Sequence, residues 1–190
     1  IASSLVGSEM CIRDRDTGWV SSDSTIELPN SSSIWIADKN TIGVNEPVKL
    51  TWTSDQNITF EKIITLDENY LFSVDQRVIN NSGLSFDLYP YGLSKRQGIP
   101  EMQNFFILHE GPLSITDGVL EEYDYDDLKD DKKIKHSSVG GWIGMTDKYW
   151  QTAIIPNQNE PVQQTYSYSF VDNIDNFQTD IVGERIAVSN

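Results

Sequence analysis

The chain has two histidines, and these are the first residues to consider for catalysis or metal binding. Neither His109 nor His136 has a second His, a Cys or a helical carboxylate at ligand spacing, so no zinc site is predicted. The sequence also lacks a GxSxG nucleophile turn, a P-loop and a dinucleotide-binding glycine pattern. We therefore expect no enzyme activity, no metal and no cofactor.

Adjacent carboxylates offer a second route to chemistry. Glu121 and Glu122, like Asp126 and Asp127, are consecutive, and on strands such neighbours point to opposite faces and cannot jointly flank a glycosidic bond. The charged window that contains them, residues 121–135, also lacks the spacing of a calcium loop. The sequence predicts a solvated edge strand and loop there.

The densest aromatic run is GGWIGMTDKYWQTAIIP, residues 140–156. Ile143 and Met145 are spaced to share one strand face, residues 146–148 form a polar break, and residues 149–155 continue as β-rich sequence that Pro156 ends. This pattern predicts a β-hairpin.

Four aromatic residues are candidate contacts for a ligand or substrate: Trp142, Tyr149, Trp150 and Tyr91. The three on the hairpin would line a groove for an apolar segment, and Tyr91 would form a binding lip. The alternative is that they are core residues or, for Tyr91, part of a turn. We expect at least one tryptophan, Trp142, in the core, because the preceding glycines allow neighbouring backbone to approach its ring.

The composition and net charge of the chain limit the kinds of partner that it can bind. The 190 residues are 38% hydrophobic, enough for one domain with a sizeable core. A formal net charge of −15 and a pI near 4.3 disfavour nucleic acid and anionic lipid headgroups. No apolar run approaches the roughly 18 to 20 residues that span a bilayer.

Short alternating segments separated by turn residues predict an all-β, antiparallel fold. Val48, Leu50 and Trp52 alternate with polar residues, as do the apolar residues of 70–78. Further expected strands cover residues 84–88, 113–120, 166–170 and 181–188. Residues 89–103 are expected to form a long surface connection.

Three stretches, in order, resemble one known family. They are YLFSVDQRVINNSG (residues 70–83), LYPYGLSKR (residues 88–96) and the Gly-Trp hairpin of residues 140–156, with acidic, Tyr-containing sequence before the hairpin. Together they are similar to the large periplasmic domain of the YidC family of bacterial membrane protein insertases, over roughly residues 46–156.

The resemblance implies an antiparallel β-supersandwich of the galactose-mutarotase-like kind, on the periplasmic side of the bacterial inner membrane. It also implies a parent protein that inserts and helps fold inner-membrane proteins. Its implied partners are hydrophobic segments of nascent membrane proteins, SecDF and the Sec translocon. The family's insertase groove belongs to membrane helices, which we expect beyond Asn190.

A carbohydrate-binding or mutarotase-like β-sandwich is the alternative, suggested by the related fold and the Trp and Tyr residues. A mutarotase needs a paired histidine and carboxylate. We expect His109 and Glu110 on opposite strand faces and His136 in a charged loop, so a binding-only version is the one that remains.

The beginning of the chain resembles translated sequencing-adapter sequence, in the run SLVGSEMCIRDR that holds the only cysteine, Cys11. We therefore expect residues 1–15 to be a non-native leader and residues 16–190 to form the periplasmic β-sandwich domain.

This expectation has a direct test. Deleting residues 1–15 should leave the melting temperature nearly unchanged, because a foreign leader makes no native contacts. A drop of several degrees, measured by differential scanning calorimetry, would show that the segment belongs to the fold.

Overall fold

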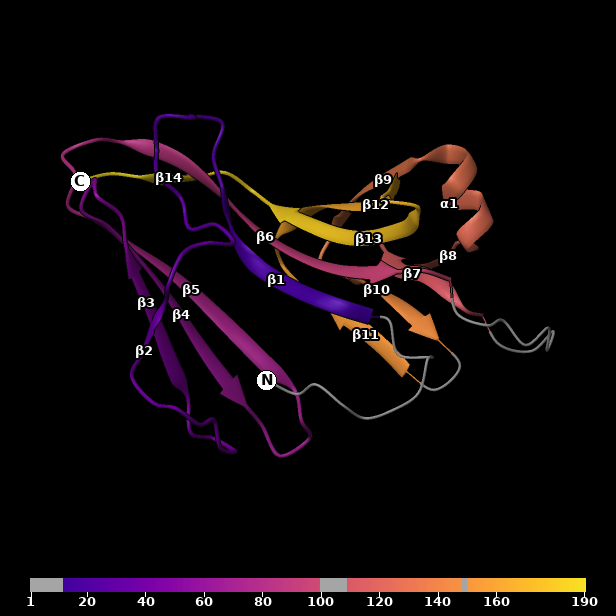
Figure 1. The fold of residues 1–190 in the computed structure, drawn as a ribbon, viewed down its shortest axis with the longest axis horizontal. Helices are drawn as coiled ribbons and strands as arrows, with labels where there is room; N and C mark the ends of the chain where they lie inside the picture. Colours follow the sequence, from indigo (N-terminus) through magenta and orange to yellow (C-terminus); the bar gives the residue numbers. More distant parts are fainter. Residues whose placement is uncertain (1–11, 100–108, 148–149) are drawn as a thin grey trace. The chain divides into compact units, whose positions relative to one another are not determined.

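The computed structural model describes residues 12–99, 109–147 and 150–190, the side chains of residues 12–14 excepted. Its elements are shown in Figure 1. In chain order they are β1 (Ile12–Val20), β2 (Ile36–Ala37), β3 (Val48–Thr53), β4 (Ile58–Leu66), β5 (Phe72–Asn80), β6 (Phe86–Gln97), β7 (Gly111–Thr116), β8 (Val119–Glu122), α1 (Tyr125–Asp131), β9 (Lys133–Val139), β10 (Trp142–Asp147), β11 (Trp150–Ile154), β12 (Pro161–Val171), β13 (Ile174–Gly183) and β14 (Ile186–Val188).

The chain divides into two compact units. Unit 1 comprises Ile1–Thr17 and Pro90–Glu184, and unit 2 comprises Gly18–Tyr89 and Arg185–Asn190. Their extended strands pair antiparallel, and α1, with seven residues, is the only α-helix in the described ranges. The predicted all-β, antiparallel sandwich class is confirmed.

Unit 2 contains a four-stranded sheet in the order β2-β3-β4-β5. The predicted strand is confirmed: β3 pairs over its whole length with β4, and on its inward face Val48 is buried while Leu50 and Trp52 are half-buried. Beyond the sheet, β14 pairs with the first residues of β6. The core of this unit is formed by five buried apolar residues: Ile26, Ile58, Phe60, Phe86 and Leu88.

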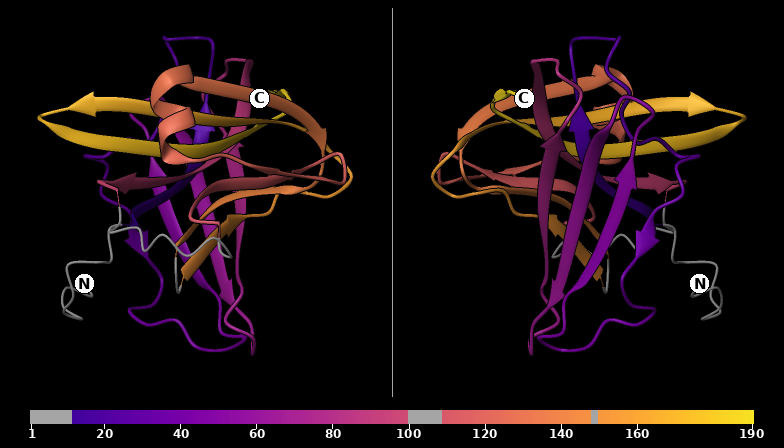
Figure 2. Two further views of the ribbon diagram at one scale, coloured as in Figure 1. Left: turned by 90° about the vertical axis from the view of Figure 1, so that its right-hand side faces the viewer. Right: turned by 90° about the vertical axis from the view of Figure 1, so that its left-hand side faces the viewer.

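Unit 1 is a sandwich of two sheets, ordered β1-β6-β13-β12-β9 and β11-β10-β7-β8. The core lies between them, because buried residues of β10 (Ile143, Met145) belong to one cluster with Tyr166 of β12 and Phe177 of β13. The long β12–β13 hairpin lies between β6 and β9 in the first of these sheets, and α1 packs against β12 (Figure 2).

Two hairpins of unit 1 close on turns that the sequence interpretation missed. The backbone φ is positive at both residues of Asp117-Gly118 and of Asp172-Asn173, as two-residue hairpin turns require. The expected single strand over residues 113–120 is therefore wrong, because the Asp-Gly turn divides it into β7 and β8.

The expected surface connection over residues 89–103 is wrong for its described part. Residues up to Gln97 continue β6, in which Tyr91–Gln97 pair with β13. Pro90 is tolerated because it lies between that stretch and the residues that pair with β14. The buried positions of the strand include Gly92, Ser94 and Arg96, so an apolar alternation was not visible in the sequence.

The charged window of residues 121–135 also differs from expectation. It contains α1, with Asp126 and Asp127 in the first helical turn rather than on a strand. The Asp127 side chain accepts a hydrogen bond from the Asp124 backbone N–H at 3.1 Å, which helps to cap the helix. His136 lies on strand β9, so its placement in a charged loop was wrong.

Strand β1 begins at Ile12, within the segment expected to be a foreign leader. That residues 1–15 are non-native stays a prediction, and the deletion described above tests it. No helix in the described ranges is long and apolar enough to cross a membrane.

Burial of Tyr125 on α1 gives the fold a testable pH dependence. This residue is 1% exposed, and burial raises the pKa of its phenol to about 12, while the guanidinium of Arg96 near its ring opposes the rise. The unfolded value is about 10, so the folded state holds this proton more tightly. The resulting stabilisation is complete below about pH 10 and is lost as the pH rises through about 12.

We therefore expect Tyr125→Phe to flatten the alkaline loss of stability. Between about pH 9 and about pH 12 the free energy of unfolding of the parent should fall by roughly 2 to 3 kcal/mol more than that of the variant. Urea denaturation at stepped pH measures this difference. Parallel stability curves for the two proteins would contradict the buried-phenol account.

Candidate functional site

The aromatic hairpin predicted from the sequence is present in unit 1. Strands β10 and β11 pair antiparallel, with Ile143 opposite Ile154 and Asp147 opposite Trp150. The other edge of β10 pairs with β7, so the hairpin is part of a sheet. Ile143 and Met145 share the buried face, and both are fully buried, as predicted.

The glycine pair before the hairpin has a backbone role. Gly140 and Gly141 have φ of 65° and 75°, in the region that favours glycine. At Gly141 the carbonyl oxygen of Ile115 occupies the place that a Cβ would need. Another part of the backbone therefore does come close to Gly141, but it is the main chain of β7 that approaches the glycine.

The four candidate contact residues have different environments. Trp150 is 62% exposed at the start of β11. Trp142 is half-buried and belongs to neither core cluster, so the expectation that it is a core residue is wrong. The reason is its position: it alternates with Ile143 and Met145, which take the buried face. Tyr149 lies outside the described residues.

Tyr91 lies in the middle of β6, not in a turn. Its hydroxyl donates a hydrogen bond to the Asp16 carboxylate at 2.7 Å, which ties β6 to β1 within unit 1. Burial, followed by this bond and the nearby charge, raises the pKa of Tyr91 well above its usual range. The hydroxyl is thus already used in a structural contact, which weakens the case for a binding lip.

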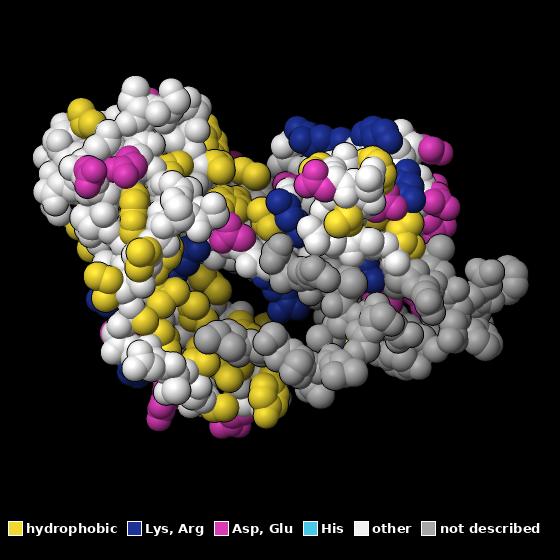
Figure 3. Space-filling view, in the orientation of Figure 1, with side chains coloured by type: hydrophobic (Ala, Val, Ile, Leu, Met, Phe, Trp, Pro, Cys, Tyr) yellow, Lys and Arg dark blue, Asp and Glu magenta, His cyan; other side chains and the backbone are white. Residues whose placement is uncertain are grey.

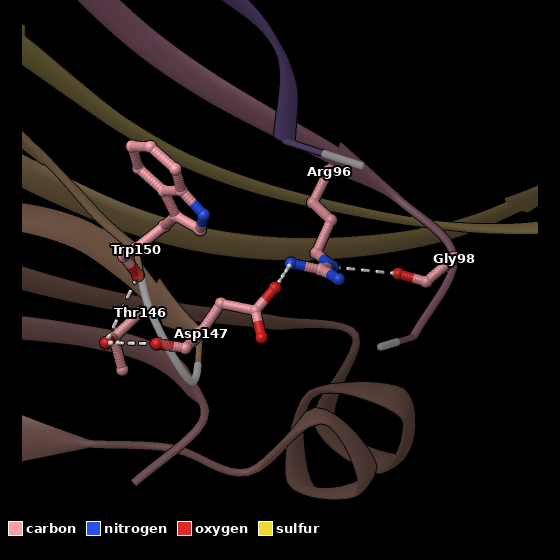
Figure 4. A network of polar contacts seen from close by, with 5 residues as sticks. All are labelled: Arg96, Gly98, Thr146, Asp147 and Trp150. Carbon is pink, nitrogen blue, oxygen red and sulfur yellow. Dashed lines mark hydrogen bonds and ion pairs between the residues drawn. The ribbon is translucent and has the colours of Figure 1, made fainter. Parts of the chain in front are cut away.

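A buried ion pair, which the sequence interpretation missed, lies beside the hairpin. Arg96 of β6 is 1% exposed, and its Nη1 donates to Asp147 Oδ2 at 2.7 Å at the end of β10 (Figure 4). Its Nε donates to the carbonyl oxygen of Gly98 at 3.2 Å. In the same view, Thr146 Oγ1 reaches the carbonyl of Trp150 at 3.5 Å.

This ion pair joins the two sheets of unit 1, and two other buried polar contacts do the same. Ser94 of β6 is 3.4 Å from Thr152 of β11 through their hydroxyl oxygens. Fully buried Gln164 of β12 accepts a bond from Thr116 Oγ1 at 2.7 Å and donates to the Ile115 carbonyl at 3.1 Å. The only sequence signal for them was polar residues at the inward positions of otherwise β-like segments.

The two histidines have separate partners. His136 Nε2 lies 2.8 Å from the Tyr123 hydroxyl, and its ring stacks on that tyrosine. His109 Nε2 lies 3.1 Å from the Pro112 carbonyl oxygen, and its Nδ1 is 3.9 Å from exposed Asp124. Neither contact brings a catalytic base to a nucleophile.

In the ranges that the structure describes, no group of three His, Cys, Asp or Glu residues is placed to hold a metal ion. What the arrangement around the hairpin offers is an exposed indole on a strand that the buried polar contacts hold in place. Such a surface suits binding of an apolar group.

The ion pair predicts a large stability effect. Asp147→Ala would leave the Arg96 guanidinium buried without its carboxylate, so we expect a loss of roughly 3 to 5 kcal/mol in the free energy of unfolding. Replacing both partners, as Arg96→Met with Asp147→Ala, should cost less than the single change, because no charge then stays buried. Urea melts measure both, and a double variant less stable than the single one would contradict this role.

Comparison with known proteins identifies relatives over nearly the whole chain. The membrane protein insertase YidC of Pelagibacter ubique is 42% identical over 154 residues, which is 80% of this chain and 27% of that protein. The YidC insertases of Rickettsia bellii and Rickettsia typhi are 38% and 37% identical over 168 residues, 88% of this chain and 30% of each relative. The chain thus spans less than a third of the length of these relatives.

The family model described as the YidC periplasmic domain matches residues 14–190. The match extends past residue 156, where the sequence resemblance was expected to end, and takes in β12, β13 and β14. The chain belongs to the YidC periplasmic domain family.

Proposed function

We propose that this chain is the periplasmic module of a longer membrane protein insertase, on the periplasmic side of the bacterial inner membrane. In this proposal the parent protein inserts and helps fold inner-membrane proteins, and the module contacts their hydrophobic segments as they emerge. The family match and the insertase names of the relatives support this assignment.

The observation that carries the contact role is the exposure of Trp150. An indole buries more apolar area on binding than almost any other side chain, and here it is 62% exposed on strand β11. Its strand neighbour β10 contributes fully buried Ile143 and Met145 to the core, so the indole stands on a fixed support. Trp142 begins β10, at the end away from Trp150, and lies on the opposite face of the hairpin, so the contact role rests on Trp150.

The module acts by binding and not by catalysis in this proposal. His136 is bonded to Tyr123. His109 Nε2 lies beside a backbone carbonyl, and its only carboxylate neighbour among the described residues is exposed Asp124, at 3.9 Å. Neither histidine therefore forms the closely hydrogen-bonded His–carboxylate pair that a mutarotase uses. The family match likewise favours an insertase module over a carbohydrate-binding sandwich. SecDF and the Sec translocon are further partners that we propose for the parent protein, with no surface assigned to either.

Site-specific cross-linking tests the contact role. A photoreactive amino acid replaces Trp150 in the full-length parent protein, which then meets a stalled, ribosome-bound membrane protein segment. We expect a cross-linked adduct, because the position is exposed on a strand that is paired into the sheet. Phe170 of β12, 60% exposed, is the matched control position, and it should give little adduct.

Stability must be measured beside binding. Trp150→Ala should change the free energy of unfolding by no more than about 0.5 kcal/mol, because the side chain is mostly in water already. Equal adduct yields at positions 150 and 170, or no adduct at either, would contradict a contact surface at the hairpin.

A further inference from the structure

Strand β5 of unit 2 is an unusually open sheet edge. It pairs with β4 along all nine residues, and in the described part of the chain it pairs with no other strand. Its outer side therefore presents main-chain donors and acceptors that a further strand can use. Phe72, Val74 and Ile79 on this strand are 53%, 38% and 46% exposed.

Several other edge strands of the described sheets carry features that discourage such pairing, whereas five-residue β11 does not. Strand β2, at the opposite edge of the same sheet, has two residues, and β8 in unit 1 has four. Strand β9 carries Lys133 and Lys135. By contrast, β5 contains no Pro, Gly or Lys. Its length and composition leave it able to accept another strand.

The charges on β5 indicate which strand it accepts. The strand carries two, Asp75 and Arg77, both exposed and of opposite sign. Neither forms an ion pair with another described residue. Glu61, which lies opposite Arg77 on β4, pairs instead with Lys49 at 3.1 Å. Both charges are therefore available to a partner strand.

A second copy of β5 can pair with both charged residues when the two strands align in one register. If two β5 strands run antiparallel about a two-fold axis at Gln76, Asp75 of each lies opposite Arg77 of the other. Moving the axis to position 75 would place two aspartates opposite each other, and moving it to position 77 would place two arginines there. The sequence of this edge thus selects a single self-complementary alignment.

The same alignment continues the apolar face of the sheet. Directly paired residues lie on one face, so Val78 shares a face with Phe60, which it opposes on β4. In the two-fold pair Val74 lies opposite Val78 of the second copy. Hydrophobic side chains gather on the surface over this sheet in Figure 3, and the added strand would extend the sheet beside them.

We propose that two copies of this chain associate through their β5 edges, antiparallel about Gln76, and so double the four-stranded sheet of unit 2. The contact is isologous, with Asp75 and Arg77 setting the register and backbone bonds joining the strands. This association is independent of the contact role proposed for Trp150, which lies in unit 1.

Sedimentation velocity over a concentration series tests the proposal. The ionic strength should be about 0.15 M, because salt at that concentration shortens the Debye length to about 8 Å and screens the repulsion between the two negatively charged copies. We expect the apparent mass to rise from 21.5 kDa toward twice that value. Asp75→Arg or Arg77→Asp alone should weaken association by about tenfold or more, because each places like charges opposite each other.

Charge reversal provides the decisive comparison. The double variant Asp75→Arg with Arg77→Asp should regain association, and a mixture of the two single variants should form mixed dimers, since unlike charges then face each other again. Glu184→Arg, at an exposed residue off the strand, is the control with the same charge change and should associate like the parent.

Several outcomes would overturn the proposal. One is a single-chain mass at every concentration. Others are equal weakening by the Glu184 control, or failure of both the double variant and the mixture to associate. A monomer whose β5 amides are protected from hydrogen exchange by an added apolar peptide would assign the edge to a peptide partner instead.

Discussion

The buried ion pair between Arg96 and Asp147 is the constraint on which the structure of unit 1 depends. A guanidinium that is 1% exposed has to be matched by a carboxylate, and the match is at 2.7 Å across the two sheets of the sandwich. Strand β6 and the end of hairpin β10–β11 must therefore keep one alignment. Trp150 is the first residue of the strand paired to that end, so its position follows from the same constraint.

Other inward-facing polar groups also hold the two sheets of unit 1 in one alignment. Gln164 bonds to two neighbouring residues of β7, and Ser94 meets Thr152, so each contact joins one sheet to the other. A polar group buried without a partner costs about 1 to 3 kcal/mol, which makes alternative alignments of the sheets unfavourable. Apolar packing around Ile143 and Met145 supplies the main stabilisation, and the polar contacts select the arrangement.

Sequence reasoning predicted the parts of the fold that follow from apolar periodicity. The antiparallel strands over residues 48–80 and the hairpin after Gly141 are confirmed, as are the buried positions of Ile143 and Met145. It failed where the inward positions are small or polar, as in β6, because Gly92, Ser94 and Arg96 carry no apolar signal. It also missed helix α1, whose two inward residues, Tyr125 and Leu128, are surrounded by acids and lysines.

For the candidate site, the sequence indicated the hairpin but not the roles of its residues. Trp142 and Trp150 have the same chemistry, yet one is half-buried and the other is exposed. That difference depends on which face Ile143 and Met145 occupy and on where β11 begins. Tyr91 was selected as an aromatic residue next to a proline, whereas its hydroxyl is bonded to Asp16, a partner 75 positions away in sequence.

The central proposal is that the module binds apolar segments at the β10–β11 hairpin. Hydrogen–deuterium exchange of the chain, with and without a peptide of transmembrane composition, tests it most directly. The account predicts slower exchange in β11 and at its partner residues on β10, with exchange in the β12–β13 hairpin unchanged. Unaltered exchange at the hairpin, or protection confined to the region around His136 and Tyr123, would contradict it.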